Sequence, residues 1–385
     1  MNSTTSQRKP YGLFLSIIAG IFLLQSCVSH LIYRKKHSDP ESVPVATKNN
    51  NPFYILPFQT SAEKVWDLIH TDLSLKVNFD SSSIDGYATL TLKPHFYSQD
   101  SLVLDARNME IYEVLTHFKE SKSVSNGSTV LTPPPTRLKF NYRQNKNLVV
   151  YFNEVITANH PVSIRIQYSA TPGKKIPISY EAWASENPEK AGENKKDTIW
   201  IDNTEFDAIS DDIGMYFINA DGKNPTKPTQ MWTQGEPQSN CHWFPTLDAP
   251  NQKHTQRISI TFPGNMQSLS NGELKSSVEM FGSNGNHLRT DVWVQNKPHA
   301  PYLTMLAVGN WVRVKDSLPW PIDPNLRKKE TLPIEYLVEP QFKDDAKMIF
   351  GNTPEMIQFF SQYTGVKYPW DKYSQVVVRD FVSGA

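Results

Sequence analysis

The stretch His70-Thr71-Asp72-Leu73-Ser74-Leu75-Lys76-Val77-Asn78-Phe79 decides the fold class, because apolar and polar residues alternate along it. A period of two is typical of a strand with one buried face. Turn residues such as Asp85-Gly86 and Asn271-Gly272 separate further runs of this kind. These runs lie at residues 87–92, 101–104, 148–152, 162–168, 257–262, 287–294 and 302–308. Many short strands with such connections predict a mainly β fold, an antiparallel β-sandwich or saddle, over residues 61–315.

The pattern changes near residue 316. A proline-rich connector precedes a strand predicted at residues 334–338, and residues 341–363 predict a helix in two pieces, broken near 351–354 and ended by Gly365. Residues 373–378 predict a buried strand. These elements cannot cover their own apolar faces. We therefore expect residues 316–385 to be the opening elements of an α/β domain, cut off before it is complete.

Length and composition describe a soluble globular body. A chain of 385 residues favours more than one domain, and 38% hydrophobic with 20% charged residues is ordinary for a folded protein. The formal net charge of +0 provides no field that would attract a nucleic acid. We therefore expect no nucleic-acid partner.

The N-terminus has the features of an export signal. Arg8 and Lys9 precede a mostly apolar run at residues 11–24, which is too short to span a bilayer. The following Leu24-Gln25-Ser26-Cys27 resembles the lipobox of bacterial lipoproteins, although Gln25 stands where a small residue is usual. We predict a signal peptide over residues 1–27 that ends in a lipidated Cys27, and a tether over residues 28–60.

This interpretation places the protein outside the cytoplasm. We expect an exported lipoprotein, anchored to the periplasmic face of the outer membrane. The alternative is an uncleaved signal anchor that continues to Arg34-Lys35-Lys36. If Cys27 carries lipid, Cys241 has no partner and the mature chain has no internal disulfide.

The segment from Trp232 to Pro250 crowds aromatic, proline and acidic residues together, and it allows three interpretations. It could be a rigid loop beside a site, or a sandwich corner in which Asp248 caps a turn and Trp243 fills the core. Third, Cys241, His242, Asp248 and His254 could ligate a metal, although adjacent Cys and His side chains rarely aim at one ion. The sequence contains no HExxH, CxxC, Gly-rich phosphate loop or G-x-S-x-G motif.

Three separated features agree with one known family in the right order. They are TQGE at residues 233–236 with WFPTLDAP at 243–250, then residues 301–311, then residues 365–385, which end in Gly384-Ala385. Together they resemble the aminopeptidase N family of gluzincin zinc aminopeptidases. The last feature resembles the approach to the family's G-A-M-E-N motif, of which this chain contains the first two letters.

The resemblance implies a fold and an activity. It implies a β-saddle over residues 61–315, and over residues 316–385 the start of a thermolysin-like catalytic domain that removes N-terminal residues from peptides. By resemblance, Glu236 binds the free α-amine of the substrate, Gln234 lines the first substrate pocket, and Gly384 and Ala385 begin the strand that aligns the peptide. The zinc ligands and catalytic residues would lie beyond residue 385, so we expect this fragment to be inactive alone.

Departures from the family pattern keep alternatives open. Asn240-Cys241 and Thr246 stand where the family commonly has Ala-Arg and Cys. One alternative is a lipid-anchored β-sandwich that binds peptides or another protein, or an inactive aminopeptidase relative. Another is the related epoxide-hydrolysing branch. The carboxylate of Glu236 favours the aminopeptidase, because recognition of an amine requires an opposite charge.

Overall fold

The computed structural model describes residues 63–116, 124–125, 128–129, 134–158, 160–172, 176–179, 198–201, 213–282, 285–319 and 331–381. Contacts between residues divide the chain into Met1–Thr60 and Ser61–Ala385, and every described residue belongs to the second unit. The predicted lipidation site Cys27 and the predicted substrate-aligning residues Gly384 and Ala385 lie outside the described residues. None of the helices in the described part is long and apolar enough to cross a bilayer.

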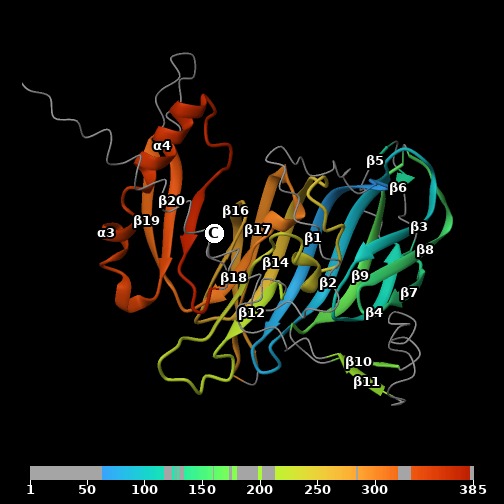
Figure 1. Ribbon diagram of the computed structural model, residues 1–385, viewed down its shortest axis with the longest axis horizontal. Helices are drawn as coiled ribbons and strands as arrows, with labels where there is room; N and C mark the ends of the chain where they lie inside the picture. Colours follow the sequence, from blue (N-terminus) through green and yellow to red (C-terminus); the bar gives the residue numbers. More distant parts are fainter. Residues whose placement is uncertain are drawn as a thin grey trace, which may run out of the picture. The chain divides into compact units, whose positions relative to one another are not determined.

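A seven-stranded sheet forms the main layer of the second unit (Figure 1). Its central strand β1 (Trp66–Asn78) contains the alternating stretch, with Leu73 and Leu75 buried and Ser74 exposed. Alternation places every second side chain on the same face, so one face of the strand enters the core. The spatial order is β16 (Glu273–Phe281), β17 (His287–His299), β14 (His254–Pro263), β1, β2 (Ser83–Pro94), β9 (Val162–Ala170) and β4 (Met109–Thr116).

Two smaller sheets share one apolar core with the large sheet, which gives the sandwich architecture. Leu90 of the large sheet, Leu102 of the three-stranded sheet and Met231 of the four-stranded sheet are all fully buried in this core. The three-stranded sheet is β3 (Gln99–Asp105), β8 (Asn147–Ile156) and β7 (Lys139–Arg143). The four-stranded sheet is β12 (Met215–Ile218), β13 (Gln230–Thr233), β18 (Leu306–Gly309) and β15 (Gln267–Ser270). Two hairpins are β5 (Val124–Ser125) with β6 (Ser128–Thr129), and β10 (Ile176–Ser179) with β11 (Thr198–Ile201).

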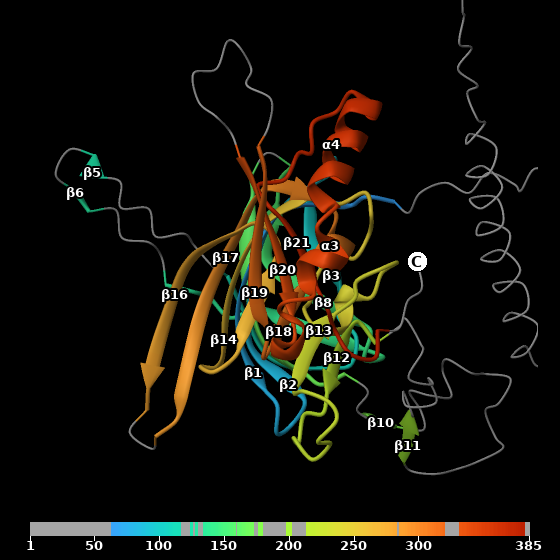
Figure 2. The ribbon, with the colours of Figure 1, turned by 90° about the vertical axis from the view of Figure 1, so that its left-hand side faces the viewer.

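The C-terminal part forms a separate α/β layer. Its sheet has the order β19 (Val312–Pro319), β20 (Thr331–Val338) and β21 (Tyr373–Val376). The helices α3 (Ala346–Phe350) and α4 (Thr353–Thr364) lie beside this sheet in both views (Figures 1 and 2). Tyr336, Ala346 and Ile357 belong to a second apolar cluster between strands and helices.

The mainly β fold and the α/β elements after it are confirmed. The two helical pieces are separated at Gly351 and Asn352, and Gly365 ends α4 with a left-handed φ of 70°. The strand predicted at 373–378 exists as β21, but it ends at Val376 and its side chains are half-buried. The domain boundary predicted between residues 315 and 316 falls within β19 and stays a prediction.

Three details differ from the sequence prediction. Residues 302–308 are not one strand, because the turn η2 (Pro301–Leu303) precedes β18 and Pro301 has no N–H to donate to a ladder. The pair β1–β14 is parallel within an otherwise antiparallel sheet. Asp85-Gly86 lies inside β2 rather than in a turn; Gly86 has a φ of 154°, and a Cβ there would lie 2.0 Å from the Ser74 carbonyl oxygen. The turn Asn271-Gly272 is confirmed, with a φ of 75° at Gly272.

Candidate functional site

The loop that follows β13 carries the two predicted substrate-binding residues that the structure describes. Gln234 is half-buried and the side chain of Glu236 is exposed. Gly235 between them is buried, and a Cβ there would lie 2.3 Å from the Tyr302 carbonyl oxygen. The close backbone approach therefore requires glycine at position 235. The loop holds a free carboxylate at the surface while its own backbone is fixed.

Asn240 fixes this loop to the neighbouring η2 segment. Its buried side-chain Nδ2 donates to the carbonyl oxygens of Pro301 and Thr304, at 2.6 and 2.9 Å. Its Oδ1 accepts a hydrogen bond of 2.7 Å from Nε1 of Trp243. One fully buried amide thus pairs with two backbone carbonyl groups outside the strands and with one indole N–H. The loop of Gln234 and Glu236 is held at its far end by this network.

The segment after Asn240 is a corner of the sandwich core. Trp243 is fully buried, and its carbonyl oxygen accepts a hydrogen bond of 3.0 Å from the Tyr168 hydroxyl. The Asp248 carboxylate accepts a hydrogen bond of 2.9 Å from the Cys241 backbone N–H. Burial raises the pKa of Asp248 to about 6. The interpretation of this segment as a corner with a capping Asp248 and a core Trp243 is confirmed.

The chain beyond β21 lies along β13, next to the loop of Glu236. The Arg379 backbone N–H donates to Oε1 of Gln230, at 3.0 Å, and its carbonyl oxygen accepts from Nε1 of Trp232, at 3.1 Å. The ring of Phe381 lies 5.5 Å from that of Trp232. Two side chains of β13 therefore hold the segment that leads toward residues 384 and 385.

Two ion pairs also connect this segment to other parts of the chain. Arg379 contacts both carboxylate oxygens of Glu339, at 2.5 and 2.7 Å, and Glu339 is only 3% exposed. Lys227 pairs with Asp380 at 2.5 Å. The Arg379 guanidinium holds the pKa of Glu339 below its usual range. These four charges neutralise one another, so Glu236 is not their partner.

The described residues do not fit a zinc site. No group of three or more His, Cys, Asp or Glu side chains among them is arranged to hold a metal ion. Of the four residues that the sequence offered as ligands, Cys241 and Asp248 form the corner and His254 is buried against His299, with ring centroids 4.9 Å apart. The fourth, His242, belongs to no such group either, and burial lowers its pKa to about 4. We therefore derive no step through a metal from this part of the chain.

Sequence reasoning proposed Gln234 and Glu236 as substrate-binding residues, which stays a prediction, and it missed the residues that hold their loop. Asn240 looked like a departure from a motif, and its role depends on carbonyl groups about 60 residues away. Arg379 and Glu339 carried no spacing signal, because the pair joins two segments 40 residues apart. What the arrangement offers chemically is an exposed carboxylate on a fixed loop that follows β13, which suits recognition of a cation.

Comparisons with known proteins found similarity over most of this chain. The model of the peptidase M1 N-terminal domain matches residues 68–177 and 181–303. Glutamyl aminopeptidase of Rattus norvegicus is 20% identical over 317 residues, which cover 82% of this chain and 27% of that protein. Transcription initiation factor TFIID subunit 2 of Danio rerio is 21% identical over 306 residues, which cover 79% of this chain and 23% of that protein. The chain thus spans about a quarter of the length of these relatives.

Solved structures share the fold. A mutant M1 zinc metallopeptidase from Deinococcus radiodurans, bound to a Tyr-Ser-Ala substrate, superposes with a TM-score of 0.54 at 16% identity, over 83% of this chain and 58% of that chain. Aminopeptidase A of Legionella pneumophila, in complex with aspartic acid, superposes with a TM-score of 0.56 at 17% identity, over 85% and 30%. At these identities the similarity shows the architecture.

Proposed function

This chain belongs to the peptidase M1 N-terminal domain family, and from that premise we propose that it is the N-terminal part of a zinc-dependent aminopeptidase. The complete protein would release N-terminal amino acids from peptides that have a free N-terminus. The observation that carries the proposal is Glu236, an exposed carboxylate on a loop whose backbone is fixed at Gly235 and Asn240.

Glu236 would bind the α-ammonium group of the substrate. A carboxylate that accepts charge-assisted hydrogen bonds selects a free amine over a blocked one, which is the specificity that an aminopeptidase requires. Gln234, half-buried next to it, would line the pocket for the first side chain. Gly384 and Ala385 would continue the segment that Trp232 and Gln230 hold against β13, and so would align the peptide beside Glu236.

We propose zinc as the cofactor of the complete protein. The described residues contain no site for it, so its ligands and the catalytic residues would be supplied by sequence other than this part of the chain. The contribution of this part is to bind and orient the peptide end.

We further propose that Cys27 is lipidated and anchors the exported protein to a membrane, on the periplasmic face of the outer membrane. The support is the basic, apolar and Leu24-Gln25-Ser26-Cys27 sequence of the N-terminus. Cells fed an alkyne analogue of palmitate should label the protein and keep it in the membrane fraction, and Cys27→Ser should lose both properties. Labelling that persists in Cys27→Ser would show that the lipid is not on Cys27.

The second candidate is a binding module without peptidase activity. The similarity to transcription initiation factor TFIID subunit 2 covers 79% of this chain, nearly as much as the 82% covered by the similarity to glutamyl aminopeptidase. In that case the loop of Glu236 would capture a peptide or protein without cleaving it.

Activity separates the two candidates. The protein produced from the complete reading frame, loaded with zinc, should hydrolyse aminoacyl p-nitroanilides, and a chelator should abolish the hydrolysis. A folded, zinc-loaded protein that releases no p-nitroaniline would contradict the aminopeptidase and leave the binding module.

A further inference from the structure

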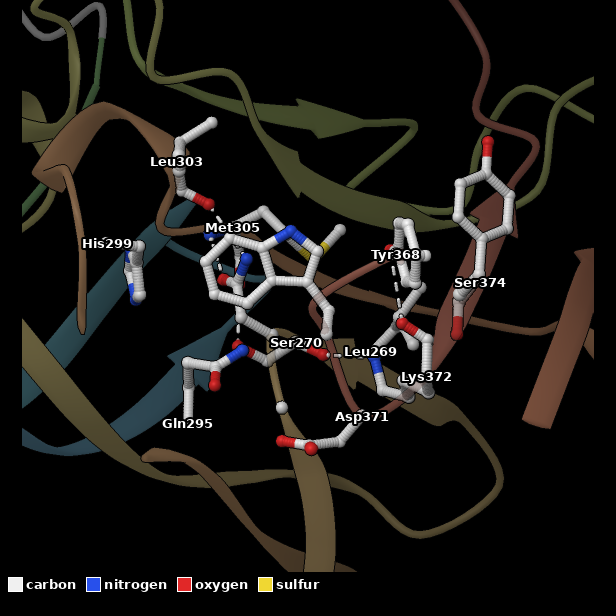
Figure 3. A pocket seen from close by; sticks show the side chains of 14 residues that line it. Leu269, Ser270, Gln295, His299, Leu303, Met305, Tyr368, Asp371, Lys372 and Ser374 are labelled. Atoms are coloured by element: carbon white, nitrogen blue, oxygen red, sulfur yellow. Dashed lines mark hydrogen bonds between the residues drawn. The ribbon is translucent and has the colours of Figure 1, made fainter. Parts of the chain in front are cut away.

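A cavity of about 230 Å³ lies between the large sheet and the segment that precedes β21 (Figure 3). Gln295 and His299 of β17 line one side, Leu303 and Met305 another, and residues 368–374 cover it. The volume is below the roughly 300–1,000 Å³ of sites for drug-sized ligands, so it suits a small molecule rather than a peptide. Glu236 is not among the lining residues, so this cavity differs from the proposed peptide site.

Lys372 brings a positive charge to this cavity. Its Nζ donates a hydrogen bond of 2.8 Å to the Ser270 carbonyl oxygen (Figure 3). It also lies 5.1 Å from the centroid of the Trp293 ring. An ammonium group has three N–H donors, and among the described residues the Ser270 oxygen is its one hydrogen-bond acceptor. The remaining donors are available to a ligand.

The acids near Lys372 are already paired with other cations. Asp371, which also lines the cavity, forms an ion pair of 2.7 Å with Lys297, and Glu335 pairs with Arg313. No carboxylate of the described residues forms a salt bridge with Lys372. Burial accordingly lowers the pKa of Lys372 to about 8, with Glu335 opposing and Arg313 adding to the shift. A partly buried ammonium without a counter-charge is costly, and an anion in the cavity would offset that cost.

Apolar and aromatic side chains form one part of the lining, beside polar residues such as Ser270, Asn271 and Gln295. Leu269, Leu303, Met305, Tyr368 and Trp370 all contribute to it. Trp370 lies edge-on to His299, with ring centroids 6.4 Å apart and planes at 78°. A cation beside aromatic and aliphatic surface is complementary to a molecule with one acidic group and an apolar body.

We propose that this cavity binds a small organic carboxylate, whose acid group pairs with Lys372 and whose apolar part packs against Trp370, Leu303 and Met305. The site is independent of peptide cleavage, and its test needs no catalytic activity. Asn240 binds the segment that contains Leu303 and Met305. One segment therefore lines the cavity and is also hydrogen-bonded to the residue that fixes the loop of Glu236.

The test is calorimetric titration of the purified chain at pH 7 with 3-phenylpropionate, and with its uncharged analogue 3-phenylpropanamide. The acid should bind saturably with one site, and the amide should bind at least tenfold more weakly. Lys372→Met, which keeps the length of the side chain but removes its charge, should weaken binding of the acid at least tenfold. Lys347→Met removes an exposed charge on α3 and should leave binding unchanged.

A second measurement keeps the proposal testable if Lys372→Met does not fold. In the unaltered chain, 3-phenylpropionate should protect Lys372 from acylation by an amine reagent, as mapped by mass spectrometry, and should not protect Lys347. No saturable binding, equal affinity for acid and amide, or equal labelling of Lys372 with and without the acid would each overturn the proposal.

Discussion

At the scale of single residues, the loop of Glu236 is positioned by a side chain that binds backbone. Asn240 is fully buried and pairs with the carbonyl oxygens of Pro301 and Thr304 and with the indole of Trp243. The Pro301 oxygen also accepts from the Thr304 backbone N–H. Among the described residues, the Thr304 oxygen and the Trp243 indole N–H have Asn240 as their hydrogen-bond partner, so without it these two buried groups would carry a desolvation penalty. The geometry of the candidate site therefore depends on one amide.

Replacing Asn240 by alanine should destabilise the fold by about 3 kcal/mol, because two buried polar groups lose their partner at about 1–3 kcal/mol each. Urea unfolding followed by tryptophan fluorescence measures this free energy. Asn141→Ala, at an exposed position on β7, is the matched control and should change it by less than about 0.5 kcal/mol. Equal free energies of unfolding for the two variants would show that the Asn240 network contributes little.

Some of the residues in this region could be interpreted from the sequence, and others could not. Trp243 and Asp248 were interpretable because a corner with a capping acid and a core indole is a local pattern. Gln234 and Glu236 came from resemblance to a motif. Asn240 was not predictable, since the same residue type on the surface would make none of these contacts.

At the scale of elements, the segment after β21 is held on β13 by backbone and charge together. The Arg379 backbone pairs with Gln230 and Trp232, while its side chain pairs with the buried carboxylate of Glu339. The ion pair connects the end of β20 to this segment and so fixes where the chain leaves the sheet. We expect it to position the strand that would align the substrate.

The Arg379–Glu339 pair predicts a pH dependence of stability. The pKa of Glu339 is lower in the folded state than its ordinary value of 4.5, so the pair stabilises the fold above that value and loses the contribution as pH falls through the folded-state pKa. Glu339→Gln should therefore lower the free energy of unfolding by about 1 kcal/mol at pH 7, a value reduced by the partial exposure of Arg379, and by progressively less as the pH falls through the folded-state pKa of Glu339.

Urea unfolding of both proteins between pH 2 and pH 7 measures the difference. Glu279→Gln, on the exposed strand β16, should show no comparable loss at pH 7. A difference between Glu339→Gln and the unaltered chain that stays constant over this pH range would contradict the assigned role of the charge.

Strands and helices were predictable wherever their periodicity was local. The alternation in β1 and the helical spacing of α3 and α4 depend only on neighbouring residues, and the structure confirms them. The parallel pairing of β1 with β14 joins residues about 185 positions apart, which no local pattern encodes. The strand predicted at 302–308 begins only at Leu306, as β18, because a proline turn held by Asn240 replaces its first part.

At the scale of the whole molecule, the chain is a β-sandwich that carries an α/β layer on its C-terminal side. Apolar side chains of α4 such as Phe359, Phe360 and Tyr363 are exposed in the described chain, while the face toward the sheet is buried at Ile357. Exposed aromatic groups that gather on one helix mark a surface for further contact. This agrees with a chain that spans about a quarter of its relatives' length.

The central claim is that Glu236 binds the free amine of a peptide in a zinc aminopeptidase. The most direct measurement is kcat/KM of the complete, zinc-loaded protein for leucine p-nitroanilide, with the exposed Glu279→Gln as control. Glu236→Gln keeps the shape of the side chain and removes its charge, so kcat/KM should fall about thirtyfold or more, a loss of about 2 kcal/mol or more of transition-state binding. Glu279→Gln should match the unaltered enzyme. Equal kcat/KM for the two variants would contradict the claim that Glu236 anchors the substrate.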